Sequence, residues 1–279
     1  MKWFLYFSII LSFSAPARSQ QVFTSFFAGM SNYSGDLSGS NYFFRHSHPA
    51  WGLGFMVELN DRMFIRAEFT DGKISGDDKF NPKNRSRNLS FQSTLSEFSL
   101  SFEYVLFNLY DYKLSPYFFA GAAAFHFKPT TKDGKGNFIV LPDYSTEGQG
   151  FYEDRKPYKL RQFSIPMGGG VLWAITDNKR IGFVVGVRKT FTDYLDDVST
   201  TYINRSVLAQ NRGLGAVAMA YRGDGSYPAE GTIRGNPKNN DLYFFSGLTF
   251  RIRLATKGKL KPYQYKPFKS KYSCPQNIW

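Results

Sequence analysis

The chain has 279 residues, of which 18% are aromatic, and a formal net charge of +13. Only 42% of the residues are hydrophobic, and the mean hydropathy is −0.35. This composition excludes a bundle of membrane-spanning helices, each of which needs about 20 mostly apolar residues in a row. It also excludes a disordered chain, which would be poor in aromatic residues. The single cysteine, Cys274, excludes an internal disulfide framework and a cysteine-based zinc site.

The first 19 residues have the layout of a secretory signal peptide. Lys2 supplies a positive start, an apolar run follows over residues 3–13, and small residues lead to Ser19. We expect cleavage after Ser19, with cleavage after Ala17 as the alternative. The other interpretation, an N-terminal membrane anchor, is disfavoured because the apolar run is short and is followed by Pro16. The predicted organisation is a signal peptide (1–19), one folded domain (20–254) and a C-terminal tail (255–279).

The mature chain contains segments in which every second residue is apolar. This period of two is typical of β-strands, whose successive side chains point to opposite faces. In the segment 97–106, for example, Phe98, Leu100 and Phe102 alternate with Glu97 and Ser99. Eight segments are predicted to be strands: 22–33, 50–60, 63–70, 97–106, 116–127, 163–175, 181–191 and 242–254.

The connections between these segments alternate between long and short. The long ones are 34–49, 71–88, 128–159 and 192–241, and the short ones are 60–61, 108–115 and 177–179. Outer-membrane barrels have short periplasmic turns and longer outer loops. The prediction is an all-β fold: an eight-stranded antiparallel transmembrane β-barrel with long outer loops and short periplasmic turns.

The two faces of the predicted strands differ in a way that places one of them in lipid. One face is a continuous series of Phe, Leu, Val, Trp and Tyr, which would be an aggregation hazard in water. The opposite face carries charges that we assign to the lumen: Glu58, Arg66, Glu68, Glu97, Glu103, Arg188, Arg251 and Arg253. An eight-stranded barrel has an interior that side chains fill, so these charges are expected to form a plug of ion pairs. A soluble β-sandwich remains the rival, because a period of two does not say which face is wet.

An ordered set of motifs resembles one family of membrane barrels. The segments Gly29–Leu37, Arg87–Phe91, Ser115–Gly121, Thr146–Gly150 and Asp193–Ser199 follow one another along the chain. Together they resemble the PorG-like outer-membrane β-barrel proteins of type IX secretion systems, and the resemblance covers about residues 22–254. The positions that carry it are Tyr33, Gly35, Asp36, Arg87, Asn88, Glu147, Gly148, Gln149, Gly150, Asp193, Tyr194, Asp196 and Asp197.

The resemblance implies a non-enzymatic component of the secretion apparatus, located in the outer membrane of a Gram-negative bacterium after signal-peptide cleavage. Its implied partners are outer-membrane lipid and the periplasmic ring formed by the lipoprotein PorK and its partner PorN, which the barrel would anchor or dock. The alternative is a small outer-membrane barrel that acts as an adhesin or as a passive or ligand-binding barrel.

Other chemistry is weakly supported by the sequence. The outer-loop acids Asp36, Asp77, Asp78, Asp193, Asp196 and Asp197 could bind Ca²⁺, but there is no EF-hand spacing. We expect them to be solvated or paired with Arg85 and Arg87. Thr146–Gly150 lacks the lysine of a phosphate-binding loop and is predicted to be a tight turn. The three histidines, His46, His48 and His126, suggest no Ser-His-acid arrangement, so neither an enzyme nor a cofactor is expected.

The excess positive charge is concentrated in the tail. Residues 255–279 contain six lysines and no acid, whereas nucleic-acid binding proteins usually spread basic residues over one face of the fold. No nucleic-acid partner is therefore expected. The tail also contains aromatic residues, which suit docking to a secretion ring, while an anionic membrane surface or plain solvation remain open. The candidate docking residues are Lys257, Lys259, Lys261, Tyr263, Tyr265 and Phe268.

Overall fold

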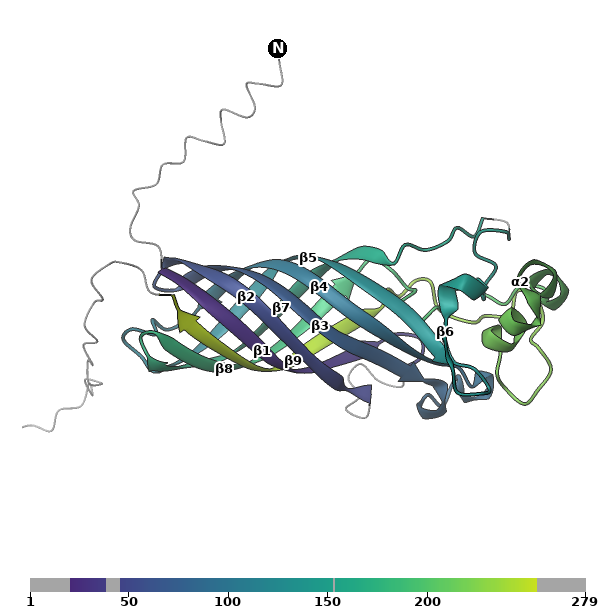
Figure 1. Ribbon diagram of the computed structural model, residues 1–279, viewed down its shortest axis with the longest axis horizontal. Helices are drawn as coiled ribbons and strands as arrows, with labels where there is room; N and C mark the ends of the chain where they lie inside the picture. Colours follow the sequence, from purple (N-terminus) through teal and green to yellow (C-terminus); the bar gives the residue numbers. More distant parts are fainter. Residues whose placement is uncertain (1–20, 39–45, 153, 255–279) are drawn as a thin grey trace, which may run out of the picture.

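The computed structural model describes residues 21–38, 46–152 and 154–254. The predicted signal peptide and the predicted docking tail lie outside these residues. Within them, eight long strands form one closed antiparallel barrel (Figure 1). The strands are β1 (Gln21–Ser34), β2 (His48–Asn60), β3 (Met63–Asp77), β4 (Ser90–Val105), β5 (Leu114–Lys132), β7 (Arg161–Thr176), β8 (Lys179–Thr190) and β9 (Leu242–Arg253).

The barrel closes because each strand pairs with two neighbours. The order around the wall is β4, β3, β2, β1, β9, β8, β7, β5, and β5 pairs back onto β4. The first and last strands meet in register, with Phe23 opposite Arg253. A single sheet that closes on itself excludes the two-sheet sandwich, and the predicted eight-stranded antiparallel barrel is confirmed.

Short turns join the strands at one end of the barrel, as predicted. The β2–β3 turn is fixed by Asn60, whose side-chain oxygen accepts hydrogen bonds from the backbone N–H groups of Arg62 and Met63, both at 2.9 Å. Thr176 does the same in the β7–β8 turn, accepting from the N–H groups of Asn178 and Lys179. By the rule for outer-membrane barrels, this turn end faces the periplasm, and the opposite loop end faces outward.

Three strands, β3, β4 and β5, are several residues longer than the sequence predicted, and β5 continues to Lys132 instead of ending at Phe127. β3 continues to Asp77 instead of ending at Thr70, and β4 begins at Ser90 instead of at Glu97. The additional residues of β3 and β4 pair in an unbroken ladder from Asp71 opposite Ser96 to Asp77 opposite Ser90. In this part of the wall the outward residues are polar, whereas Ile74, Phe91 and Leu95 point inward and are buried, so the alternation continues with its apolar side facing the interior. The wall therefore extends beyond the apolar part of the barrel at the loop end.

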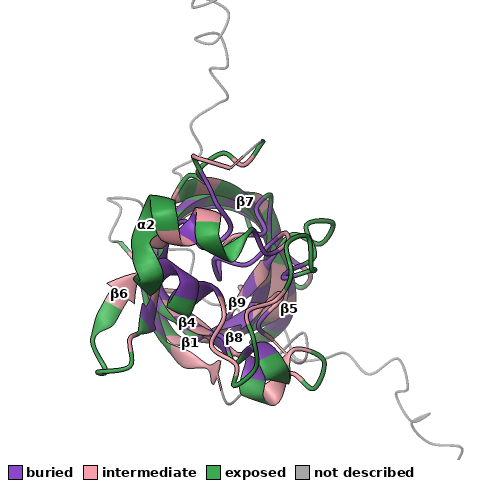
Figure 2. Cartoon of the chain, turned by 90° about the vertical axis from the view of Figure 1, so that its right-hand side faces the viewer, coloured by how far each residue is buried: buried purple, intermediate pink, exposed green. Residues whose placement is uncertain are grey.

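The outer loops contain regular structure that the sequence analysis did not find. A short strand, β6 (Phe138–Val140), pairs with the end of β5, and a helix, α2 (Arg205–Ala220), lies in the loop between β8 and β9. The helix begins where the side chain of Asn204 accepts hydrogen bonds from the N–H groups of Ser206 and Val207. It lies at the loop end of the barrel, near its mouth (Figure 2). None of the helices in the described residues is long and apolar enough to cross a membrane.

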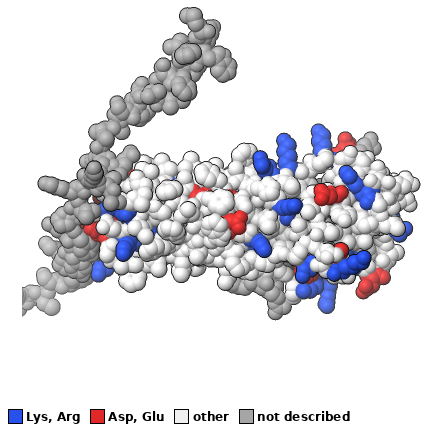
Figure 3. Space-filling model, viewed as in Figure 1, with Lys and Arg blue, Asp and Glu red and all other residues white. Residues whose placement is uncertain are grey.

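The outer surface of the wall is apolar and the inner surface is polar. Large hydrophobic side chains are exposed along the strands, with Phe163 reaching 71% exposure. Seen from the side, the middle of the barrel is largely free of charge, and charged side chains gather toward its two ends (Figure 3). All eight predicted lumen charges lie on the inward face: seven are buried, and Arg253 is partly buried. This inside-out pattern is that of an outer-membrane β-barrel protein.

Candidate functional site

Two buried polar networks occupy the barrel, one in the lumen and one under the outer loops. In the lumen, the carboxylate of Glu97 accepts hydrogen bonds from the guanidinium of Arg188, with nitrogen–oxygen distances of 3.1 to 3.3 Å. The hydroxyl of Tyr243 donates to the same carboxylate at 2.7 Å. The Arg188 guanidinium also lies 4.5 Å from the centre of the Phe245 ring. A buried charge is tolerated only when it is paired and hydrogen-bonded in this way.

A second lumen cluster is centred on Glu103. Arg251 binds both of its carboxylate oxygens, and the Nη2–Oε2 distance is 3.0 Å. Arg66 lies between Glu103 and Glu68, with nitrogen–oxygen distances of 3.7 and 3.9 Å. The Arg66 guanidinium is 4.8 Å from the ring centre of Phe119. Three of the four predicted lumen arginines thus contact predicted lumen acids directly.

The fourth arginine reaches its acid through a tyrosine. Arg253 donates to the hydroxyl of Tyr110 at 2.6 Å, and that hydroxyl lies 2.7 Å from Glu58. A neighbour of this group, Arg180, is only 1% exposed and was not among the predicted lumen charges. Its guanidinium lies 4.5 Å from the ring centre of Phe23. Arg180 stands one residue before the predicted strand 181–191 and in phase with its inward positions, so the alternation would have found it with a longer segment.

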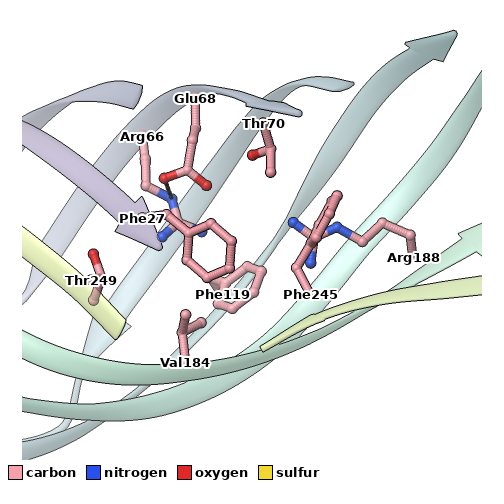
Figure 4. A pocket seen from close by; sticks show the side chains of 9 residues that line it. All are labelled: Phe27, Arg66, Glu68, Thr70, Phe119, Val184, Arg188, Phe245 and Thr249. Atoms are coloured by element: carbon pink, nitrogen blue, oxygen red, sulfur yellow. Dashed lines mark ion pairs between the residues drawn. The ribbon is translucent and has the colours of Figure 1, made fainter. Parts of the chain in front are cut away.

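A cavity in the lumen has a volume of about 10 Å³, which is room for about one water molecule (Figure 4). The rings of Phe27, Phe119 and Phe245 line it together with the Arg66–Glu68 pair and Arg188. Glycines make room for these rings, because a Cβ at Gly186 would come within 2.7 Å of Phe119. The interior is a packed plug of charged and aromatic side chains.

The second network, the outer cap, is formed by residues 35–38, 78–89, 141–152 and 191–241, together with Tyr33 at the end of β1 and Tyr158. Glu147 is fully buried at its centre. Its carboxylate accepts hydrogen bonds from Arg234 at 2.8 Å, from the N–H of Ser199 at 2.9 Å and from the N–H of Thr200 at 3.0 Å. The hydroxyl of Tyr194 adds a contact at 3.3 Å. One carboxylate thus ties the loop before β7 to two parts of the loop before β9.

Two buried arginines hold the cap segments together. Arg87 binds Asp78 with two hydrogen bonds of 2.7 and 2.8 Å and donates to the backbone carbonyl of Asp36 at 2.9 Å. It also donates to the backbone carbonyl of Arg234. Arg234 in turn donates to the carbonyl of Asp197 at 2.7 Å. The predicted pairing of Arg87 with an outer-loop acid is therefore present, with Asp78 as the acid.

Among the described residues, a group of carboxyls in the cap has no arginine bound to it. The Tyr33 hydroxyl donates to Asp196 and lies 3.2 Å from Asp241. Burial, followed by the nearby charge of Asp36, raises the pKa of Asp196 to about 8. Burial and the charges of Asp196 and Asp193 raise the pKa of Asp241 well above its ordinary value. Backbone N–H groups also donate to them, Leu37 and Val198 to Asp196 and Leu195 to Asp241, and the raised pKa values favour the protonated carboxyls.

The expectation that the loop acids are solvated is wrong for three of them. Asp193, Asp196 and Asp197 are all buried. Burial, with the charges of Asp196 and Asp36, raises the pKa of Asp193 to about 9. Asp197 accepts hydrogen bonds from Thr146 at 2.6 Å and from Tyr158 at 2.7 Å. Burial raises the pKa of Asp197 to about 6, against the opposing charge of Arg234.

The remaining motif positions shape the cap backbone. Thr146–Gly150 forms consecutive turns, as predicted, and Gly148 and Gly150 adopt φ values of +82° and +91° that favour glycine. A Cβ at Gly35 would come within 1.9 Å of Asp241. The side chain of Gln149 accepts from the N–H of Glu147 at 3.1 Å. Asn88 is exposed and donates to the carbonyl of Arg222 at 3.2 Å.

Within residues 21–38, 46–152 and 154–254, no group of three or more His, Cys, Asp or Glu side chains is arranged to hold a metal ion. His48 lies 2.7 Å from the hydroxyl of Ser75, and His126 is exposed on the outer face of β5.

A family model matches most of the chain. It covers residues 2–209 and carries the description "Domain of unknown function (DUF6089)". The chain belongs to this family. No curated protein matches the sequence.

Solved structures that resemble this DUF6089 chain include three small surface barrels. The first is Ail, the attachment invasion locus protein of Yersinia pestis, in complex with the heparin analogue sucrose octasulfate; it is 9% identical, the match covers 84% of this chain and 99% of that chain, and the TM-score is 0.41. The second is neisserial surface protein A, which is 11% identical, with 84% of this chain and 97% of that chain covered and a TM-score of 0.43. The third is the outer membrane protein OprG from Pseudomonas aeruginosa, which is 9% identical, with 84% of this chain and 97% of that chain covered and a TM-score of 0.41.

Proposed function

We propose that the protein is a non-enzymatic outer-membrane component of the type IX protein secretion apparatus, which anchors or docks the periplasmic ring proteins. The observation that carries the proposal is the convergence of the PorG-like motif positions. Tyr33, Asp36, Arg87, Glu147 and Asp196 come from four segments of the chain and take part in the single buried network of the outer cap. The motif set that carries the resemblance is thus a structural unit.

The packed lumen supports a scaffold in preference to a channel. The cavity between Arg66, Arg188 and the surrounding rings holds only about 10 Å³, which is too little for a folded cargo or a hydrated solute. A barrel with a filled interior acts through its surfaces, and the surface that reaches the periplasm is the turn end together with whatever follows β9. The basic, aromatic tail is the proposed docking element, with Lys257, Lys259, Lys261, Tyr263, Tyr265 and Phe268 as its contact residues.

The first experiment is deletion of the gene in its host, with secretion of a cargo protein that carries a type IX sorting domain as the readout. The proposal expects the cargo to remain in the cell and the PorK- and PorN-like ring proteins to co-purify with a tagged wild-type barrel. Normal secretion by the deletion strain would contradict it.

The second experiment truncates the chain after Thr256. We expect the barrel to assemble, as judged by its heat-modifiable migration in gels, while the ring proteins no longer co-purify. A matched control keeps the tail and replaces Tyr263, Tyr265 and Phe268 by serine, which preserves the lysines. Loss of co-purification in both variants assigns docking to the aromatics, whereas loss in the truncation alone assigns it to the positive charge. Retention in both would end the tail-docking proposal and leave the barrel assignment intact.

The alternative, an adhesin or ligand-binding barrel, is favoured by one observation. The outer cap is a large, internally bonded structure with its own helix, α2, and its own hydrophobic cluster around Ile203, Leu208 and Ala216. Loops that only connected strands would not need such a core. Normal cargo secretion combined with loss of surface attachment in the deletion strain would favour this second function.

A further inference from the structure

Exposed cations stand on the outer surface of the wall just beyond its apolar part, at the loop end. They are Lys73 on β3, Lys128 on β5, Arg161 on β7 and Lys189 on β8, and we call them the basic patch. Together with β4, their strands are consecutive around the barrel. Lysine and arginine side chains project from the loop half of the wall in the view of Figure 3.

The basic patch occupies only one side of the barrel. The other three strands, β9, β1 and β2, carry no lysine, arginine, aspartate or glutamate on their outward face. Their charged residues, Glu58, Arg251 and Arg253, belong to the lumen. Contact with hydrocarbon accounts for the uncharged side, but it gives no reason for cations on the other side.

The positive charge of the basic patch is not cancelled within the described residues, where none of its four members takes part in an ion pair. Two acids share the outward face of these strands. Asp71 accepts a hydrogen bond from the Ser96 hydroxyl at 2.6 Å, and Asp77 is paired with Lys79 at 3.1 Å. One acid without a cation thus stands beside four cations, and the patch keeps a net positive charge.

The basic patch lies at the height of lipid headgroups. Its members stand two to four residues beyond the last outward apolar residues of their strands, as Arg161 does from Phe163 and Lys73 from Phe69. At about 3.3 Å per residue and a strand tilt of about 40°, their backbone lies roughly 5–10 Å above the hydrocarbon edge. The headgroup layer on each side of a bilayer is about 5–8 Å thick. Flexible lysine and arginine side chains therefore reach the headgroups of neighbouring lipids.

Two of the cations are arranged around a hydroxyl. Lys73 lies opposite Thr94, and Thr94 lies opposite Lys128. Two strand spacings separate the lysine backbones by about 9–10 Å, and the exposed Thr94 side chain stands between them. A phosphate group carries the negative charge and the acceptor oxygens that two ammonium groups and a hydroxyl require.

We propose that the basic patch binds the phosphate-bearing headgroup of a lipid in the outer leaflet of the outer membrane. The phosphate supplies the missing negative charge, and the acyl chains of the same lipid continue onto the apolar wall directly below. A soluble acidic protein would match the charge alone and would make no use of that adjoining apolar surface. The proposal rests on the outer-membrane barrel and concerns its outer end, whereas ring docking concerns the periplasmic end, so each can fail without the other.

The test measures binding of bisphosphorylated lipid A to the full chain in nonionic detergent micelles by native mass spectrometry, with the same lipid stripped of its phosphates as the comparison. The phosphorylated form is expected to bind more tightly. Lys73→Gln combined with Lys128→Gln should weaken its binding about thirtyfold, because each positive charge near an anionic lipid surface contributes about fivefold. Both positions are exposed, so the double variant should keep the heat-modifiable gel migration of the wild type.

Arg62→Gln combined with Lys113→Gln is the matched control. These two cations are also exposed, and their loss changes the net charge equally, but they lie at the turn end of the barrel. The proposal requires this variant to bind the phosphorylated lipid as the wild type does. Equal weakening in both double variants, equal binding of the lipid with and without phosphates, or tighter binding of a polyglutamate peptide than of the lipid would each overturn the proposal.

Discussion

The lumen and the outer cap both bury carboxylates, but they neutralise them differently. In the lumen, Glu97 and Glu103 are bound by the guanidinium groups of Arg188 and Arg251. In the cap, Asp193, Asp196 and Asp241 are buried, no arginine in the part of the chain that the structure describes binds them, and Tyr33 supplies a hydroxyl donor. The lumen therefore depends on fixed ion pairs, whereas part of the cap depends on bound protons. The first is expected to be insensitive to pH over the physiological range, and the second is expected to respond to it.

The largest expected effect is in the lumen. Glu97→Ala leaves the buried guanidinium of Arg188 without a counter-charge, which costs about 3–5 kcal/mol of barrel stability. The measurement is urea unfolding of the protein folded into lipid vesicles, supported by heat-modifiable gel migration. Asp224→Ala, at an exposed position of the β8–β9 loop, serves as the control and should leave stability unchanged. Equal effects of the two substitutions would remove the distinction between a paired lumen acid and a solvated acid.

A smaller and more local effect is expected in the cap. Arg234→Met removes the ion pair with Glu147 and the hydrogen bond to the carbonyl of Asp197. Because backbone N–H donors still satisfy Glu147, we expect a loss of about 1.5–3 kcal/mol, the range for hydrogen bonds to charged groups. Hydrogen exchange should accelerate for residues 193–203 and stay unchanged in the middle of β4. Equal acceleration in the strand would show that cap and lumen unfold as one unit.

The pH dependence of the cap follows from its raised pKa values. The folded cap keeps protons on Asp196 and Asp193, with pKa values of about 8 and 9, at pH values where the unfolded chain has lost them. The stabilisation of the folded cap by these two bound protons is complete below about pH 4. It decreases as the pH rises toward the folded pKa values, and the stability of the cap stops changing with pH above them. Proteolysis within residues 191–203, normalised to a peptide substrate, should be at least about tenfold faster at pH 9 than at pH 5, a change of about 1.4 kcal/mol.

Asp196→Asn tests whether this slope belongs to the buried acids. The amide stays neutral at every pH, so the variant is expected to be protected better than the wild type at pH 9 and to show a flatter profile. Asp224→Asn, which changes an exposed acid, should reproduce the wild-type profile. A wild-type cap that became more resistant as the pH rose would have the opposite sign and would contradict the proton-dependent picture.

The smallest expected effect concerns the hydroxyl shared by two of these acids. Tyr33→Phe removes the donor that contacts Asp196 and Asp241 and leaves the ring packed against Phe91. The cost is about 1 kcal/mol, the net value of one typical hydrogen bond, measured as faster exchange of the Leu195 and Val198 amides. A cost as large as that of Glu97→Ala would mean that Asp196 is charged and depends on Tyr33 in the way a lumen acid depends on its arginine.

The barrel could be predicted from the sequence because its wall repeats one local rule. Alternation in segments such as 97–106 identified both the lipid face and the inward charges. The prediction was incomplete at the strand ends: Arg180 stands just before a predicted strand, and from Asp71 to Asp77 the apolar side of β3 changes from the lipid face to the interior, where Ile74 is buried. The helix α2 escaped notice because Gly213 and Gly215 interrupt a segment with little amphipathic pattern.

The cap could be predicted only in part. The motif residues were identified individually, but the contact between Tyr33 and Asp196 joins positions 163 residues apart, and that between Glu147 and Arg234 joins positions 87 apart. No local pattern reports such contacts. Acids in a long polar loop look solvated when the sequence is considered alone, and only the folded chain shows that Asp193, Asp196 and Asp197 are buried.

The even number of wall strands has a practical consequence for engineering. Because β1 begins and β9 ends at the same rim, where Phe23 pairs with Arg253, a tag fused to either end of the domain is hidden from antibodies added to intact cells. The exposed Asp224–Gly225 position, between α2 and β9, lies on the opposite rim and outside every strand and helix. A short epitope inserted there would be displayed on living cells without breaking a wall hydrogen bond, which would make the barrel a carrier for surface labelling.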